Sequence, residues 1–185
     1  MSSVSRRHVT WALGVSPEVL TEYAGTTLRA YYTDARTMLF TQLESARRFR
    51  ELYGVEVVSP HIAVPAYVGV AALGAEVVFP EDDSPMVANQ GRVLPTNDSV
   101  ARLSVPSADD SLLLQRQLGM RRFFEAETGQ SPPIGAGQEG PITSAMLLRG
   151  ERFLEDLYDE PSLAHRLLDI VTDTYIAFVR YVRTI

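Results

Sequence analysis

The stretch at residues 131–150, SPPIGAGQEGPITSAMLLRG, decides the fold more than any other part of the sequence. It reads as a short extended segment, a glycine-rich bend and the start of a helix. The glycines at 135, 137 and 140 permit backbone conformations and close approaches that other residues resist. Pro141 suits the first helical turn, where its missing N–H would have had no partner. We therefore expect a strand-to-helix turn whose free backbone N–H groups favour anionic or oxygen-rich ligands.

The same stretch contains a literal match to the dinucleotide-binding fingerprint, Gly135-x-Gly137-x-x-Gly140. That fingerprint requires a buried hydrophobic strand immediately before it. Residues 129–133 read Gly-Gln-Ser-Pro-Pro, which leaves Ile134 as the only strand-forming residue. We therefore reject a nicotinamide or flavin site. Two interpretations of the bend stay open: a turn that serves geometry alone, and a ligand site with Glu139 at its mouth.

The composition is that of an ordinary globular protein of one domain. The chain has 185 residues, of which 45% are hydrophobic and 22% charged. A formal net charge of −6, without a run of basic residues, argues against a nucleic-acid surface. The absence of lysine excludes Schiff-base and lysine-nucleophile mechanisms within these residues. The absence of cysteine excludes disulfides, thiolate nucleophiles and cysteine-ligated zinc.

The N-terminus superficially resembles a twin-arginine export signal, with Ser5-Arg-Arg-His before an apolar run at residues 11–15. That run contains Gly14 and stops at Ser16-Pro17, which makes it too short for the hydrophobic region of an export signal. No stretch has the apolar length that a membrane-spanning helix requires. We therefore expect a soluble, cytoplasmic protein with no membrane partner.

Helical periodicity dominates the chain. Residues 17–31 predict one or two short helical turns broken at Gly25, and residues 34–53 predict a longer helix that Asp34 caps and Gly54 ends. Further helices are expected over residues 65–74, 110–129, 142–158 and 162–185, with an irregular stretch, including a short strand or two, at 84–110. In the last helix, seven residues predict one buried stripe: Leu163, Leu167, Ile170, Val171, Thr174, Phe178 and Val182.

Three short strands are expected between these helices, near residues 55–59, 75–79 and 133–137. Strands that alternate with helices predict a parallel α/β fold with the helices packed outside. His61 follows the first strand, and ligands collect at the carboxyl ends of such strands. A lone histidine is nevertheless more often a hydrogen-bonded structural residue. The three carboxylates at 81–83 are expected to form a solvated turn rather than a cation site.

The chain ends at Ile185 inside an amphipathic helix, without a capping signal. A complete (β/α)8 barrel needs about 250 residues. The sequence therefore predicts a partial barrel, apparently truncated after a helix. We expect His61, Gln138 and Glu139 to lie together on one rim of this barrel as substrate-binding residues. No residue is assigned a catalytic role.

Residues 31–185 resemble the N-terminal half of the uroporphyrinogen decarboxylase (URO-D) superfamily, which comprises TIM-barrel decarboxylases and related cobalamin-dependent methyltransferases. Four segments carry the resemblance: VVSPHI at 57–62, ALGAEVVFPEDDSPMV at 72–87, GPITSAMLLRGERFL at 140–154 and LYDEPSLAHRLLD at 157–169. The resemblance implies a TIM (β/α)8 barrel of URO-D type, of which residues 31–185 form the N-terminal half. Residues 1–30 match poorly and are expected to form an N-terminal arm with short helices.

The departures from the family pattern decide the subfamily. True porphyrinogen decarboxylases grip substrate carboxylates with an arginine-rich N-terminal motif, and Arg6-Arg7 lack that context. They carry a catalytic aspartate where this chain has His61, and a tyrosine near the position of Leu147. A histidine does not supply the fixed negative charge that meets cationic pyrrole nitrogens. A lyase of porphyrin biosynthesis is therefore the alternative and not the leading interpretation.

The resemblance favours the cobalamin-dependent branch, in which zinc activates a substrate thiol that takes a methyl group from a corrinoid. The zinc ligands of that branch lie in the second half of the barrel. We therefore expect no metal ligand and no cofactor in this chain. A full-length protein would use zinc and a corrinoid partner. The expected binding partner is a small-molecule substrate or a corrinoid protein. A third interpretation is a non-catalytic or partner-dependent half-barrel, whose exposed apolar faces favour a homo-oligomer.

Overall fold

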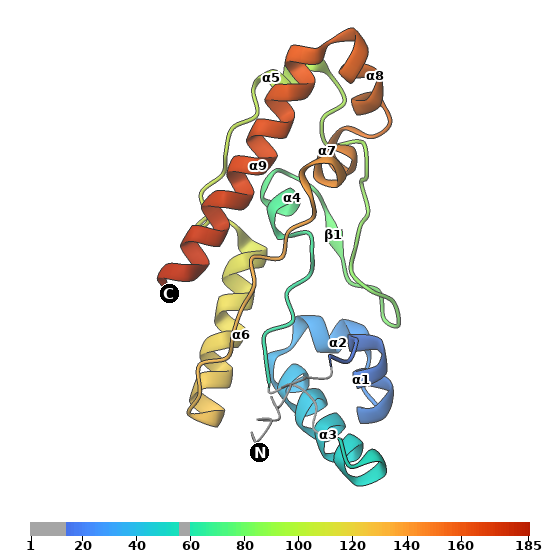
Figure 1. Cartoon of the computed structure of the whole chain (residues 1–185), viewed down its shortest axis with the longest axis vertical. Helices are drawn as coiled ribbons and strands as arrows, with labels where there is room; N and C mark the ends of the chain where they lie inside the picture. The colour runs from blue at the N-terminus through green and yellow to red at the C-terminus, as the bar shows by residue number, and fades with distance from the viewer. Residues whose placement is uncertain (1–13, 56–59) are drawn as a thin grey trace, which may run out of the picture.

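The computed structural model describes residues 14–55 and 60–185, which form an elongated, mostly helical molecule (Figure 1). The helices are α1 (Pro17–Ala24), α2 (Leu28–Thr33), α3 (Ala35–Tyr53), α4 (Val68–Ala72), α5 (Asn97–Ala101), α6 (Leu112–Thr128), α7 (Pro141–Arg149), α8 (Arg152–Asp159) and α9 (Pro161–Thr184). The strands are β1 (Val77–Val78) and β2 (Met86–Val87). No helix among the described residues combines the length and the apolar character needed to cross a lipid bilayer.

The three N-terminal helices follow their sequence signals closely. Gly25, in the left-handed conformation with φ 71°, ends α1, as the predicted break requires. The Asp34 side chain caps α3 by accepting a hydrogen bond of 2.7 Å from the backbone N–H of Thr37, and Gly54 ends α3 with φ 65°. α1, α2 and α3 pack together at one end of the molecule (Figure 1). The predicted boundary between residues 30 and 31 falls inside α2, and the division into arm and domain stays a prediction.

The expected parallel sheet is reduced to a few contacts in the described residues. β1, within the strand predicted at 75–79, pairs with β2 in antiparallel register, Val77 opposite Val87, and its parallel pairing stays a prediction because most of the strand expected at 55–59 is not described. The proline- and aspartate-rich turn between them, PEDDSP, folds the chain back on itself. A parallel contact does join Ile62 to Ile134, where Pro133 accepts a hydrogen bond of 3.2 Å from the N–H of Ile62. Most of the strand expected at 55–59 lies outside the described residues.

One expected helix is two helices. The chain predicted to be helical over 142–158 forms α7 and α8, which are separated at Gly150 with φ 75°. Glycine is also required at this break by its close approach to the loop after β2, because a Cβ at Gly150 would lie 3.0 Å from the Cα of Gly91. The N–H of Gly91 also donates a hydrogen bond of 2.8 Å to the carbonyl of Leu147, which connects the loop after β2 to α7. α5 lies within the stretch that was expected to be irregular.

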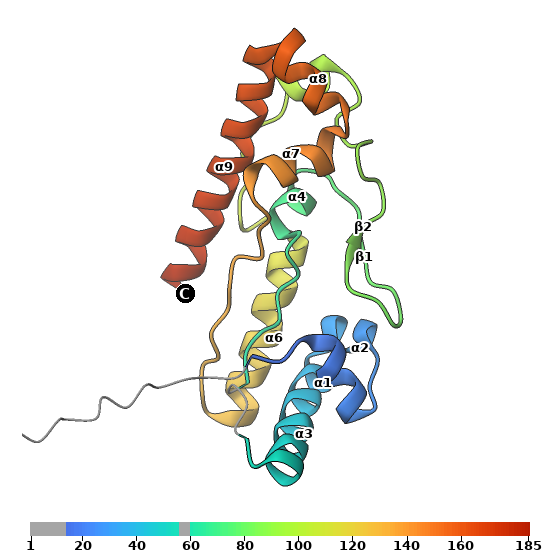
Figure 2. The same cartoon turned by 45° about the vertical axis from the view of Figure 1, so that its right-hand side comes forward.

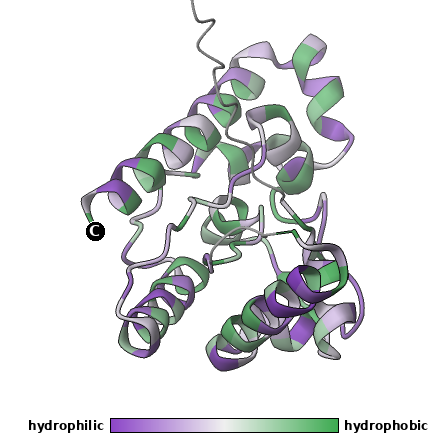
Figure 3. Cartoon of the chain, turned by 60° about the horizontal axis from the view of Figure 1, so that its bottom comes forward, coloured by the Kyte–Doolittle hydropathy of each residue, from purple (hydrophilic) through white to green (hydrophobic). Residues whose placement is uncertain are grey.

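The long C-terminal helix α9 packs on α5, α7 and α8 at the end of the molecule opposite α1–α3 (Figure 2). Five of the seven residues predicted for its buried stripe are buried: Leu167, Ile170, Val171, Thr174 and Phe178. Leu163 and Val182 are partly buried. Hydrophobic and hydrophilic residues alternate along the long helices, as expected for helices that bury one side (Figure 3). α6 connects the two ends by packing on both α3 and α4.

A buried ion pair holds the C-terminal end together. Arg149, at the end of α7, and Asp156, in α8, are 2% and 4% exposed, and their closest atoms, Nε and Oδ2, are 2.8 Å apart. The guanidinium also donates to the carbonyl of Leu94 at 2.9 Å and to the side-chain oxygen of Asn97 at 2.6 Å. Arg149 thus joins α7, α8 and the segment that leads into α5.

We predict that Arg149→Met destabilises the protein by about 3–5 kcal/mol, because it leaves the Asp156 carboxylate buried without its counter-ion. Urea unfolding measures the change in free energy. Glu51→Gln, which removes the exposed pair that Glu51 forms with Arg47, is the control and should cost far less. Equal losses in the two variants would contradict a central role for Arg149.

A second prediction concerns acid sensitivity at the start of α3. Hydrogen bonds from the side chain and backbone of Thr37 hold the pKa of Asp34 below its usual value. A lowered folded-state pKa means that the stabilisation is complete above the unfolded value and is lost as the pH falls through the folded one. Asp34→Asn keeps the cap without the titration, so its stability should fall less between pH 5 and pH 2.

Asp34→Ala removes the cap itself and should cost about 1 kcal/mol at neutral pH. Stability curves of the wild type and both variants, measured by urea unfolding across this pH range, provide the comparison. An unchanged acid dependence in Asp34→Asn would contradict the assignment.

Candidate functional site

A pocket of about 530 Å³ lies beside the contact between Ile62 and Ile134. Its described lining residues are Gly14, Val15, His61, Ile62, Pro133, Ile134 and Gly135. The pocket therefore joins the end of the first expected strand to the start of the glycine-rich bend. Among these described lining residues His61 alone has a polar side chain, and no arginine or carboxylate is present. The pocket consequently fits a ligand that is largely apolar.

His61 is held through its backbone by the side chain of Gln42 from α3. The Gln42 amide oxygen accepts a hydrogen bond of 2.8 Å from the N–H of His61, and its Nε2 donates to the His61 carbonyl at 2.8 Å. The imidazole itself is partly buried. Its Nδ1 atom is fully buried and has no hydrogen-bond partner among the described residues. The backbone of His61 is thus fixed, whereas the Nδ1 atom of its ring has no hydrogen-bond partner among the described residues.

Tyr31 completes this arrangement. Nε2 of Gln42 donates its second hydrogen bond to the Tyr31 hydroxyl oxygen at 2.9 Å, and the Tyr31 side chain is 0% exposed. Burial raises the pKa of Tyr31 well above its usual range, and burial also raises the pKa of the neighbouring Tyr32 to about 12. Both phenols are therefore neutral near pH 7. Tyr32 packs edge-on against Tyr31, with ring centroids 5.3 Å apart.

The structure places Gln138 and Glu139 on a different contact. Gln138 forms an antiparallel bridge with Tyr67, beside a hydrogen bond of 3.0 Å from the Val68 N–H to the Gly137 carbonyl. Its side chain packs so closely on Gly69 of α4 that a Cβ there would collide with the Gln138 amide oxygen. The carbonyl of Glu139 accepts a hydrogen bond of 3.4 Å from the Ser144 hydroxyl in α7.

The described lining of the His61 pocket includes neither Gln138 nor Glu139. The structure therefore does not bring these three side chains together in that pocket. Substrate binding by His61, Gln138 and Glu139 stays a prediction. For Gln138, the packing against Gly69 adds a structural role, because its side chain helps to join the bend to α4.

The sequence analysis did not single out Gln42 or Tyr31. A signal for Gln42 was present, because it falls at helical spacing after Met38 and Leu39, within the stripe that α3 buries. A polar side chain in such a stripe must find hydrogen-bond partners inside the protein. Nothing in the sequence showed that the partner would be the backbone of His61.

A second pocket, of about 370 Å³, lies between α4, β1 and the start of α6. Arg116 and Phe79 both line this pocket. The guanidinium carbon of Arg116 lies over the Phe79 ring, 5.5 Å from the ring centroid. None of the predicted site residues lines it. An anionic group bound in this second pocket would contact the cationic side chain of Arg116.

Metal binding requires several ligands that converge. Among the described residues, no group of three or more His, Asp or Glu side chains could hold a metal ion. The whole chain also lacks cysteine. These residues consequently do not fit a zinc site with thiolate ligands.

Comparison with known proteins identifies the family of this chain. The sequence profile of the uroporphyrinogen decarboxylase (URO-D) family matches residues 6–184. The chain belongs to the URO-D family. The match includes most of residues 1–30, so the expectation that this part matches poorly is wrong.

A relative described as a uroporphyrinogen decarboxylase, from Frankia casuarinae, is 29% identical over 184 residues, covering 92% of this chain and 46% of the relative. Among solved structures, a methyltransferase from Methanosarcina mazei is similar with a TM-score of 0.62 and 23% identity. That similarity covers 94% of this chain and 49% of the methyltransferase, and it shows a shared fold. The URO-D chain thus spans about half the length of the relatives it matches.

We predict that Gly137→Ala disrupts the bend of this URO-D chain. Gly137 has φ 60°, and a Cβ there would collide with the Pro65 carbonyl and the Val64 side chain. The expected cost is about 1–3 kcal/mol from backbone strain alone, measured by urea unfolding. Gly135→Ala is the matched control, because nothing lies within 4 Å of a Cβ there. Similar stabilities for the two variants would show that the bend tolerates a side chain at Gly137.

Proposed function

We propose that this chain is the N-terminal half of a TIM (β/α)8 barrel of URO-D type. The family match supports this assignment, as does the coverage of about half of each relative. The parallel contact between Ile62 and Ile134 is the start of the parallel pairing that such a barrel requires. The remaining strands would come from further chain or from a partner.

We assign corrinoid-linked methyl transfer to the complete protein, of the methyltransferase or demethylase type. The observation that carries this proposal is the lining of the His61 pocket, which contains no cationic side chain among its described residues. A porphyrinogen with several carboxylates needs cations to bind it. His61 also stands where the decarboxylases have an aspartate. The likeness to the methyltransferase from Methanosarcina mazei supports the same branch.

In this proposal the described residues bind and orient a small, largely apolar substrate. The described pocket walls are apolar, and His61 supplies one polar contact on the rim, with Gln138 and Glu139 farther along the bend. Because the residues present do not fit a zinc site, zinc and the corrinoid would be brought by other residues or by a partner protein. A cytoplasmic location and a homo-oligomer belong to the same proposal.

Two alternatives rest on particular observations. The name of the Frankia relative supports a porphyrin-biosynthesis lyase, and Arg116 in the second pocket is a cation that a carboxylate would contact. Large exposed apolar side chains support a half-barrel that is inactive without a partner. Leu112 and Tyr158 are each 88% exposed, and Ile142 is 64% exposed.

We predict that the purified chain alone forms no coproporphyrinogen from uroporphyrinogen and binds no zinc more tightly than micromolar. No set of ligands among the described residues converges on a metal, and the arginine clamp of the decarboxylases has no counterpart among the described lining residues of the His61 pocket. A porphyrinogen turnover assay and calorimetric zinc titration measure the two outcomes. Turnover well above background would overturn the methyl-transfer assignment in favour of the lyase.

The methyl-transfer assignment is tested on the protein encoded by the complete reading frame. Demethylation of methylcobalamin in the presence of a thiol and zinc is followed by its absorbance change. We expect turnover in the wild type and a loss on replacing His61 with Phe, which keeps an aromatic ring without the nitrogens. A reading frame that adds no His-x-Cys and later Cys, together with no demethylation, would instead support the non-catalytic alternative.

A further inference from the structure

The contact between Gln42 and His61 is unusual because a side chain takes the place of a neighbouring strand. The Gln42 amide presents one acceptor and one donor to the N–H and the carbonyl of a single residue, as the opposite residue does in a hydrogen-bonded pair of an antiparallel β-ladder. Both bonds are 2.8 Å long. The strand end that carries His61 is thus fixed from α3, and not only by the contact of Ile62 with Ile134.

The orientation of the amide follows from its partners. If its oxygen and nitrogen were exchanged, the Gln42 nitrogen would face the His61 N–H and two donors would oppose each other. Nε2 also donates to Tyr31 at 2.9 Å, so both of its protons are used. Gln42 is 5% exposed and Tyr31 is 0% exposed, so water does not compete for these bonds.

The His61 ring is the part of the residue that this clamp leaves available. Nδ1 is buried without a partner among the described residues, whereas the residue lines the pocket and is partly exposed. Nε2 is therefore the ring nitrogen left for a ligand in the pocket. Where the ring lies relative to the pocket depends on the backbone position of His61, and Gln42 fixes that position.

The geometry points to Gln42 as a positioning residue of the site, oriented by Tyr31, which holds His61 so that one ring nitrogen is offered to a ligand in the apolar pocket. The inference rests on the proposed function only in taking His61 as a ligand contact. The positioning itself is measurable without substrate, so its failure and the failure of methyl transfer are separate results.

The experiment compares His61 in four variants of the chain. Gln42→Ala removes the clamp, and Gln42→Glu replaces both donors with an acceptor. Ser45→Ala is the matched control, because Ser45 lies on the same helix, is 0% exposed and donates to the Leu20 carbonyl at 2.7 Å without contacting His61. Gln90→Glu introduces the same charge at an exposed position.

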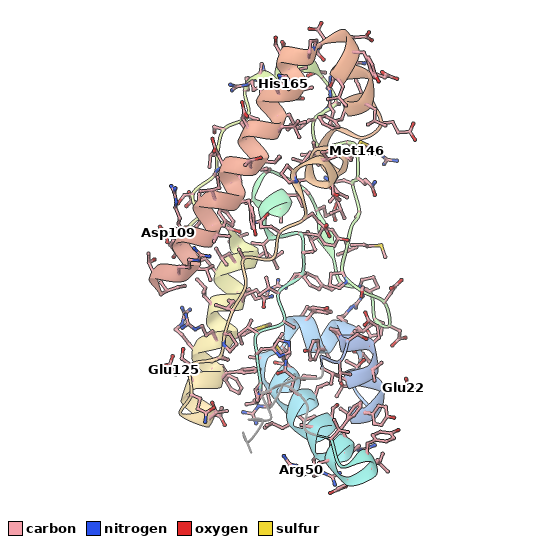
Figure 4. All side chains as sticks on the ribbon, in the orientation of Figure 1. Glu22, Arg50, Asp109, Glu125, Met146 and His165 are labelled. Atoms are coloured by element: carbon pink, nitrogen blue, oxygen red, sulfur yellow. The ribbon has the colours of Figure 1, made fainter. Side chains whose placement is uncertain are left out.

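Two signals report on His61. The first is its ring nitrogen and carbon resonances in histidine-labelled protein, assigned with His61→Gln. The second is the rate of carbethoxylation by diethylpyrocarbonate, measured by mass spectrometry relative to His165. That reference residue is exposed on α9, at the end of the molecule far from α1–α3 (Figure 4).

We expect the His61 resonances to move in both Gln42 variants and to stay near the wild-type positions in Ser45→Ala and Gln90→Glu. The ratio of His61 to His165 modification should change several-fold in Gln42→Ala. In Gln42→Glu the resonances should return towards wild type on acidification, because burial favours the neutral acid, which can again donate to the His61 carbonyl. A variant that only lost packing would show no such return.

The proposal is wrong if Gln42→Glu leaves the His61 signals within the range of the two controls at both high and low pH. It is also wrong if Ser45→Ala moves them as far as Gln42→Glu does, because loss of α3 stability would then explain the change. Should Gln42→Ala fail to fold, Gln42→Asn, which shortens the amide by one methylene, takes its place in the modification assay.

Discussion

The buried guanidinium of Arg149 is the constraint on which the C-terminal end of this URO-D chain depends. Removing two charges from water is costly, and the cost is met only when every charged atom finds a partner. Arg149 donates to both Asp156 oxygens, to the Leu94 carbonyl and to the Asn97 side chain. Because these partners come from two segments besides α7, the loop before α5 and the turn between α7 and α8 have to form together. α9 packs on α5, α7 and α8.

The N-terminal end is organised by a second polar group, the amide of Gln42, and the pocket lies where the segment after α3 meets the bend after α6. α3 fixes His61 through this amide, while Ile134 comes from the bend that leads into α7. One wall of the pocket is therefore positioned by α3 and the other by the bend between α6 and α7. A change in the packing of either end would alter the distance across the pocket.

Local signals in the sequence were sufficient where a single residue determines the backbone. Asp34, Gly25 and Gly54 set helix ends that the structure reproduces. The sequence was insufficient where a distant segment decides. Gly150 reads as a tolerable residue inside a helix, yet the structure breaks the helix there with φ 75° and places Gly150 against Gly91. The predicted rim likewise placed His61 beside Gln138 from strand order alone, whereas the amide of Gln138 packs on Gly69.

The same contrast bears on the short strands of this chain. Strands of two residues and single-residue bridges join the strand-forming segments among the described residues, and isolated pairs of this kind are marginal in water. Backbone N–H and C=O groups of a barrel interior must nevertheless find partners. Gln42 supplies them for His61 from a side chain, which makes this strand end less dependent on a neighbouring strand. The wall of the pocket at His61 is thus fixed by residues of this chain, whereas no group of three or more metal-ligating side chains converges among the residues that the structure describes.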